Sequence, residues 1–105
     1  MADDLLDPIK AAARRKELEM SLHAMQAAYA DAISPDDIRQ ALINGQILED
    51  YPHHRRGACC LIYGDTEAGR PVHVVCTSSR QPVLIITVYV PMLPKWITPT
   101  QRNVA

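Results

Sequence analysis

A histidine stands in the middle of an apolar stretch, GRPVHVVC, at residues 69–76. Alternation along a strand puts Val72, Val74 and Cys76 on one face and His73 on the other. A histidine in a strand is most often a core residue whose ring nitrogens have hydrogen-bond partners. The alternative is a general acid or base, because an imidazole titrates near neutral pH. The surrounding segments must decide between these two roles.

Two tyrosines accompany this histidine if the neighbouring strands have the register that makes one sheet face wholly apolar. The apolar face then comprises Val72, Val74, Cys76, Leu84, Ile86, Val88, Val90, Cys60 and Ile62. The opposite face collects Leu61, Tyr63, His73, Val75, Ile85, Thr87 and Tyr89. A histidine between two tyrosines offers a titratable group, hydroxyl donors and a surface on which RNA bases stack. Ordinary cover for a second apolar patch is the alternative for both tyrosines.

A second cluster is the run His53-His54-Arg55-Arg56, within YPHHRRGACC at residues 51–60. A solvated loop is its simplest interpretation, and a loop that touches phosphate is the next. Zinc sites typically use Cys-x-x-Cys or His-x3-His spacing, which this run and the adjacent Cys59 and Cys60 lack. We therefore expect no metal and no cofactor, and reduced thiols throughout.

The phosphate-binding and nucleophile motifs of large enzyme classes are absent from the sequence. There is no P-loop, no Gly-x-Gly-x-x-Gly and no Gly-x-Ser-x-Gly, so ATP, dinucleotide and esterase chemistry lose their usual support. Glu49 and Asp50 are adjacent in a predicted strand and point to opposite sides, so they are not a paired acid and base.

The composition predicts one soluble, cytoplasmic domain covering residues 1–105, with 48% hydrophobic content. No apolar run is long enough for a membrane span, and the acidic N-terminus is unlike a secretory signal. Residues 1–50 carry 5 basic and 10 acidic side chains, which gives −5. Residues 51–105 carry 6 basic and 2 acidic side chains, which gives +4. A bound anion should therefore meet the second half.

Helical signals fill the first half of the chain. Asp7 and Pro8 predict a helix start, within an N-terminal helical extension at residues 1–17. Over residues 17–32, an amphipathic helix is predicted with an inward stripe of Leu18, Leu22, Met25 and Tyr29, and His23 on its flank. Residues 34–45 form the clearest helix, capped by Ser34, with Ile38, Ala41 and Leu42 inward.

Strand-like alternation follows residue 45. Four strands are predicted, at residues 46–51, 58–64, 70–76 and 82–90, and short loops make them antiparallel. The tail at residues 92–105 is rich in proline and predicted to be irregular, with Trp96 as its anchor. The predicted fold is α+β, with two to three N-terminal helices packed on one face of a four-stranded antiparallel sheet.

Several of these segments, in order, resemble the DUF4258 domain family. They are SLHA at residues 21–24, ISPDDIRQAL at 33–42, ILEDYP at 47–52, CLIYG at 60–64, GRPVHVV at 69–75, and TVYVP at 87–91 followed by Trp96. The resemblance spans about residues 18–102. The family is similar to compact RNA-cleaving toxins of the RelE and MqsR kind, whose antitoxin partners include a zinc-finger type.

The resemblance implies a RelE-like fold whose active face lies opposite the helices. It places the family's recurring histidines at His23 and His73, its tyrosine at Tyr89 and its late arginine at Arg102. Two departures are Asp31-Ala32, where a basic residue and glycine are usual, and YVPMLPKW at residues 89–96, where the family is more acidic.

The leading hypothesis is a metal-independent endoribonuclease, the toxin of a type II toxin-antitoxin system. His23, His73 and Tyr89 would be catalytic, and the RNA-binding residues would be Tyr63, Arg70, Lys95 and Arg102. The partners would be RNA, as free or ribosome-associated mRNA, and a cognate antitoxin. Whether His23 reaches the sheet face of His73 stays open.

Two other functions remain. The same face could bury a partner protein in a non-catalytic binding module, which the near-neutral net charge favours. A weaker alternative is a metal-binding regulator that uses His53, His54 and the thiols.

Overall fold

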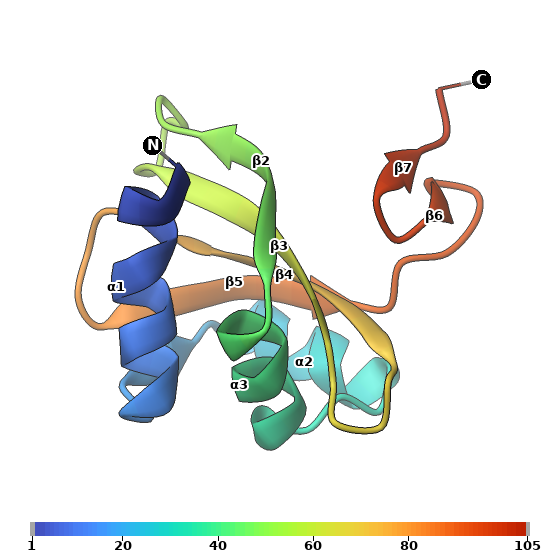
Figure 1. Ribbon diagram of the computed structural model, residues 1–105, viewed down its shortest axis with the longest axis horizontal. Coiled ribbons are helices and arrows are strands. Elements are labelled where there is room, and N and C mark those ends of the chain that lie inside the picture. Colours follow the sequence, from blue (N-terminus) through green and yellow to red (C-terminus); the bar gives the residue numbers. More distant parts are fainter. Residues whose placement is uncertain (1, 105) are drawn as a thin grey trace.

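The computed structural model describes residues 2–104 and has a mixed α+β fold (Figure 1). Its elements in chain order are α1 (Ala2–Arg14), β1 (Leu18–Met20), α2 (Leu22–Ala30), α3 (Pro35–Ile43), β2 (Gln46–Tyr51), β3 (Cys59–Asp65), β4 (Pro71–Thr77), β5 (Val83–Tyr89), β6 (Trp96–Thr98) and β7 (Gln101–Arg102). In Figure 1, α2 and α3 lie below the strands, and α1 runs along the left side of the sheet. No helix among residues 2–104 is long and apolar enough to cross a membrane.

The main sheet has five strands in the order β1-β5-β4-β3-β2, and β1 runs parallel to β5. The prediction of a four-stranded, wholly antiparallel sheet is therefore wrong. The additional strand, Leu18–Met20, lies inside the segment that periodicity assigned to a helix. Ser21 ends it, because the Ser21 hydroxyl accepts from the Ala24 amide and caps α2 at that point.

Three of the four residues of the apolar stripe expected to face the core lie on the outside of α2, while Leu18 is in β1 and packs against the core. Leu22, Met25 and Tyr29 are 69%, 50% and 90% exposed, while Ala24 and Ala28 are buried. Alanine has no bulk beyond Cβ, so the helix can lie close along β5 on its alanine face. The three larger side chains are therefore left facing solvent.

The first helix begins earlier than Asp7 and passes through Pro8. Leu6 and Ile9 recur at helical spacing and are both buried, so burial of this stripe continues the helix on either side of the proline. Ala12 and Ala13 are also buried, and α1 thus contributes Leu6, Ile9, Ala12 and Ala13 to the main core. Residue 1 of the expected extension lies outside the described residues.

The third helix agrees with its prediction in detail. Ser34 and Asp37 form a reciprocal capping box, and Pro35 is the first helical residue. Ile38, Ala41 and Leu42 are buried under the sheet, as expected.

A β-bulge in β5 corrects the predicted register. Val75 pairs with Thr87 but Cys76 pairs with Ile85, so Ile86 is an extra residue in its strand. Val83 and Ile85 consequently enter the core with Val88. The prediction that Leu84 and Ile86 face the core is wrong. They belong to the face away from the helices, which we call the free face.

The C-terminal tail, predicted irregular over residues 92–105, is not wholly irregular, because β6 and β7 pair with each other. Residue 105 lies outside the described residues. The anchor of the tail agrees with the prediction, since Trp96 is only 3% exposed. In Figure 1 this hairpin stands apart from the main sheet at the upper right.

The backbones of α3 and β3 approach so closely at Gly64 that only a glycine fits there. A Cβ at this position would lie 1.8 Å from the Ala41 carbonyl oxygen, so the helix backbone would have to move. We expect Gly64→Ala to lower the free energy of unfolding by about 3 kcal/mol or more, measured in urea. Gly57→Ala, where nothing lies within 4 Å, is the control for added backbone strain alone. Equal stability of the Gly64 variant and wild type would contradict this packing.

Candidate active site

Tyr63, His73 and Tyr89 lie directly opposite one another on three adjacent strands, as the alternation predicted. The His73 ring is 6.1 Å from the Tyr63 ring and 5.2 Å from the Tyr89 ring, both edge-on. The Tyr89 hydroxyl oxygen is 3.2 Å from His73 Nδ1. The free face therefore carries a compact aromatic and imidazole cluster.

The tail covers this cluster, and His73 is fully buried. Trp96 meets the imidazole edge-on at 4.4 Å, and His73 Nε2 lies 2.7 Å from the Pro99 carbonyl oxygen. A carbonyl only accepts, so Nε2 carries the proton and Nδ1 accepts from the Tyr89 hydroxyl. With the tail in place both ring nitrogens are occupied, as the core-residue alternative for this histidine requires.

Burial also sets the charge of His73. It lowers the pKa of His73 below its usual 6.5, because a charged ring loses its hydration, while the Pro99 carbonyl acts in the opposite direction. The imidazole is neutral at pH 7. Burial likewise raises the pKa of the Tyr89 hydroxyl.

Arg102 fastens the tail across the cluster. Its Nε and Nη2 donate to the two oxygens of Glu49 at 2.6 and 2.8 Å, and its guanidinium lies 4.7 Å from the Trp96 ring centre. The hydrogen bond from Arg102 lowers the pKa of Glu49 to about 2. Tyr51 donates a further hydrogen bond to this carboxylate. Arg102 therefore lies beside the cluster but is engaged within the protein.

The other predicted RNA-binding cations lie elsewhere. Arg70 Nη2 donates to the Ala32 carbonyl at 2.8 Å and lies 3.9 Å from Asp37, so it braces the α2–α3 turn. Lys95 is exposed in the tail, immediately before Trp96. Neither makes a hydrogen bond or ion pair with His73 within residues 2–104.

A second site, which we call the basic groove, is open to solvent and has a volume of about 630 Å³. It lies between the start of α2, the β2–β3 loop and the β4–β5 turn. Its lining contains two histidines, three arginines and no carboxylate: Ser21, His23, His54, Arg55, Arg56, Gly57, Ala58, Thr77, Ser79, Arg80, Leu84 and Ile86.

Specific contacts hold the walls of the basic groove. The Ser21 hydroxyl donates to the Ile86 carbonyl at 2.9 Å, which fixes the first turn of α2 and hence the backbone of His23 against β5. The Ser78 amide donates to the Ala58 carbonyl at 3.1 Å and joins the two loops. The bulge turns Leu84 and Ile86 into the lining, because their neighbours occupy the core.

Most of the positive charge in the basic groove is available to a ligand. Arg80 pairs with Glu19 at 3.3 Å, whereas Arg55 and Arg56 have no ion-pair partner within residues 2–104. His54 Nδ1 accepts from the Arg56 amide, so the other nitrogen of a neutral ring carries the proton. His53 does not line the groove.

The groove and the buried cluster share the free face but are separate. Thr77 lines the groove and follows His73 by four residues on the same face of β4. That spacing corresponds to about 13 Å of extended strand. His23 lines the groove, to which His73 does not contribute, so the structure does not bring the two histidines together.

Sequence reasoning missed the groove as a site. The run of two histidines and two arginines was a visible signal, although a solvated loop explained it equally well. Arg80 and Ser21 gave no signal, because they join this loop only through the sheet and the α2 cap.

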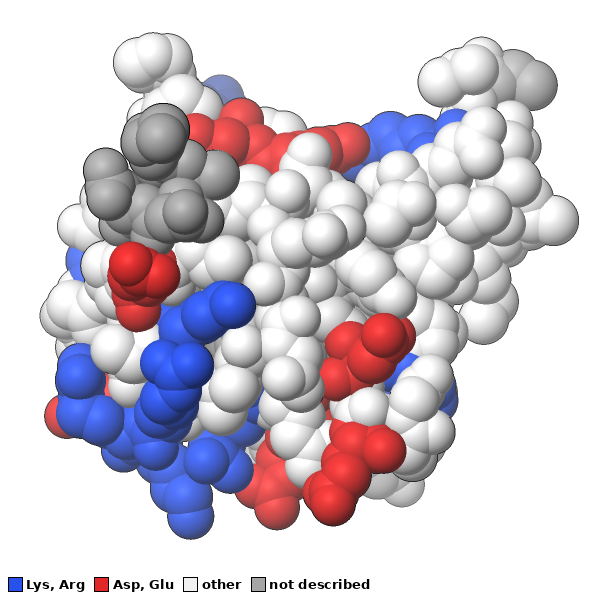
Figure 2. Space-filling model, in the orientation of Figure 1, with Lys and Arg blue, Asp and Glu red and all other residues white. Residues whose placement is uncertain are grey.

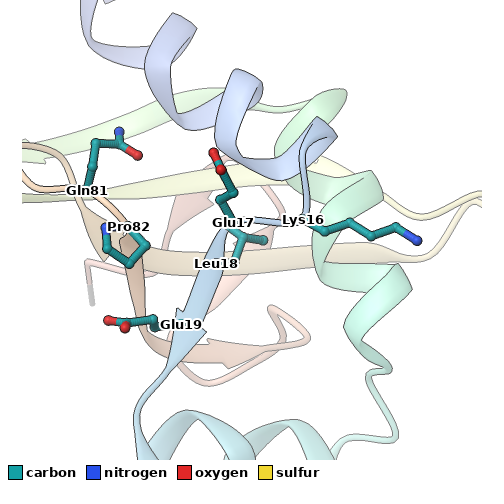
Figure 3. A pocket seen from close by; sticks show the side chains of 6 residues that line it. All are labelled: Lys16, Glu17, Leu18, Glu19, Gln81 and Pro82. Atoms are coloured by element: carbon teal, nitrogen blue, oxygen red, sulfur yellow. The ribbon is translucent and has the colours of Figure 1, made fainter.

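Two other surfaces carry less chemistry. Figure 2 shows basic side chains gathered over the lower end of α1, where Arg14, Arg15 and Lys16 are exposed, so positive charge is not confined to the second half. A depression beside β1 contains charges of both signs. In Figure 3, Lys16 extends away from Glu17 and Glu19, so these groups do not converge.

Because His73 is buried, we expect its removal to lower the free energy of unfolding. His73→Ala leaves a cavity and deprives Tyr89 and Pro99 of their partner, and should cost on the order of 2 to 4 kcal/mol. Urea unfolding measures the loss, with His53→Ala as an exposed histidine control.

The pH dependence provides a second readout of the same variant. Because the folded pKa of His73 is below 6.5, its contribution is complete above pH 6.5 and declines as pH falls below it. The difference in stability between wild type and His73→Ala should shrink in that direction. A variant as stable as wild type at pH 7 would contradict the buried role.

Comparison with known proteins gives one match. The model of the DUF4258 family, described as a domain of unknown function, matches residues 20–90. No curated protein and no solved structure matches the chain. The matched range runs from the end of β1 to just beyond β5 and contains the whole lining of the basic groove. The chain belongs to the DUF4258 family.

Proposed function

We propose that this protein is a metal-independent endoribonuclease, the toxin of a type II toxin-antitoxin system, and that it cleaves RNA in the basic groove. The observation that carries the proposal is the lining of that groove, two histidines and three arginines with no carboxylate. Arginine binds phosphate through paired donors, and a polyanionic strand favours such a surface. RNA, as free or ribosome-associated mRNA, is the substrate.

The chemistry needs a base, an acid and cations, all of which the groove offers. In the proposed reaction one histidine removes the proton of the 2′-hydroxyl, whose oxygen attacks the adjacent phosphorus. The bond from phosphorus to the 5′-oxygen breaks, and a protonated histidine gives that oxygen its proton. A 2′,3′-cyclic phosphate and a 5′-hydroxyl result. His23 takes the role of the base and His54 that of the acid, because His54 Nδ1 already accepts from the Arg56 amide and the other ring nitrogen carries the proton. Arg55 and Arg56 stabilise the charge on phosphorus.

The buried cluster has a different part in this proposal. His73 and Tyr89 cannot contact substrate while Trp96 and Pro99 cover them. They contribute to catalysis only if the tail moves away. Tyr63 and Arg102 depend on the same movement, since both border this cluster.

The resemblance to RelE and MqsR toxins supports the assignment through architecture. Such a toxin needs a sheet with helices on one side and a substrate face on the other. The chain has helices on one side, and the groove on the free face. A cognate antitoxin, of the zinc-finger type in the MqsR case, would be the protein partner.

A non-catalytic binding module is the second candidate, and one observation favours it. Leu22, Met25 and Tyr29 form a row of exposed apolar side chains along α2, which is a common feature of protein-binding helices. The row begins beside His23, so a protein bound there would also reach the groove.

RNA-cleavage measurements on matched histidine variants test the proposed endoribonuclease activity of the basic groove. We expect His23→Ala to reduce cleavage of total RNA by about 10² to 10⁴, the contribution of one general acid or base, without lowering the melting temperature. His54→Ala should behave alike. His53→Ala, one residue away and outside the groove, should stay active.

Two results would contradict the proposal. Full activity of a folded His23→Ala, His54→Ala double variant would remove the groove from catalysis. A folded wild type that cleaves no RNA would favour the binding module.

A further inference from the structure

The tail is attached over His73 by side chains and one carbonyl rather than by strand pairing. β6 and β7 form a sheet of their own and are not hydrogen-bonded to the main sheet as strands. The contacts that close the cluster come from Trp96, Pro99 and Arg102.

Two of these contacts present a particular chemistry to His73. Trp96 supplies a flat ring, edge-on at 4.4 Å and 87° to the imidazole. Pro99 supplies a carbonyl oxygen that accepts from Nε2 at 2.7 Å. A flat ring and a carbonyl acceptor occur together in a single nucleobase such as uracil or guanine. The tail thus occupies a slot that is also suited to a base.

The ion pair that fastens the tail is reachable by solvent, whereas Trp96 beneath it is buried. The Arg102–Glu49 pair is partly exposed, with 46% and 27% of the two side chains accessible. A bidentate pair is stronger than a pair with a single contact, but water and salt still screen one that is this exposed. The outer side of the hairpin is not packed, since Ile97 is 52% exposed.

We propose that the tail occupies, in cis, a nucleobase-binding slot formed by Tyr63, His73 and Tyr89. When the tail opens, one base of single-stranded RNA takes the place of Trp96 and accepts from His73 Nε2. This inference rests on the proposed function and extends its substrate site. The slot and the basic groove lie on the same face, so one strand can place a base in the slot and phosphates in the groove.

The closed tail then sets the affinity for RNA. A site that is open for only a fraction of the time binds with an affinity reduced by that fraction. Loosening the tail should raise the affinity for RNA, and only for RNA that carries bases.

Glu49→Gln should loosen the tail without changing any residue of the tail itself. It removes the carboxylate that holds Arg102 and leaves every residue of the slot in place. Asp50→Asn is the matched control, because it makes the same change of charge on the next residue of β2. Within the described part of the chain, Asp50 makes no hydrogen bond or ion pair with the tail.

Two uncleavable probes separate base binding from phosphate binding. One is a hexamer of 2′-O-methyl uridylate, and the other is an abasic hexamer with the same backbone. We expect Glu49→Gln to bind the uridylate probe about tenfold tighter than Asp50→Asn does, because a loosened tail leaves the slot open in a larger fraction of the molecules. The two variants should bind the abasic probe equally.

Hydrogen exchange of residues 96–102 reports whether the tail has loosened, and Arg102→Gln releases it from the other side. Faster hydrogen exchange of the tail in a variant that shows no preference for the uridylate probe would overturn the proposed nucleobase slot. Unchanged exchange in both variants would overturn the fastening on which the inference depends. Because neither probe can be cleaved, these outcomes do not depend on catalysis, and loss of the proposed activity would leave the base preference measurable.

Discussion

The extra residue in β5 is the constraint on which both sites depend. Ile86 has no partner of its own in the pairing with β4, so the strand changes faces at this point. On one side of the bulge, Val83 and Ile85 enter the core and Leu84 and Ile86 line the basic groove. On the other side, Tyr89 lies opposite His73. A regular strand could not meet both demands, since a shift of one residue exchanges its faces.

The free face of the sheet is thus divided between two kinds of environment. The half under the tail is dry, and its histidine is neutral and doubly hydrogen-bonded. The half beside the start of α2 is exposed to solvent, and its arginines can bind an anion. Catalysis of phosphate transfer requires exposed cations and an accessible acid and base, which favours the open half. Recognition of a base requires a flat, dehydrated contact, which the closed half provides.

Local signals predicted the parts of this fold that local contacts determine. The helix capped by Ser34 and the strand containing His73 followed from spacing and alternation, and Tyr63, His73 and Tyr89 were correctly placed together. β1 has three residues and pairs with a strand 65 positions away, so no local pattern identified it. The bulge and the cover over His73 likewise depend on distant contacts. The stripe on α2 misled because it matched a buried helix, although alanines are the residues that pack.

The central claim is that RNA is bound and cleaved in the basic groove, and mapping of the bound strand by NMR tests it most directly. Amide shifts of the wild-type protein would be followed while an uncleavable single-stranded RNA is added. The account predicts the largest changes at His23, at residues 54–57 and at Arg80, with smaller changes along β4 toward His73. Changes confined to the exposed basic end of α1, at Arg14, Arg15 and Lys16, would contradict it.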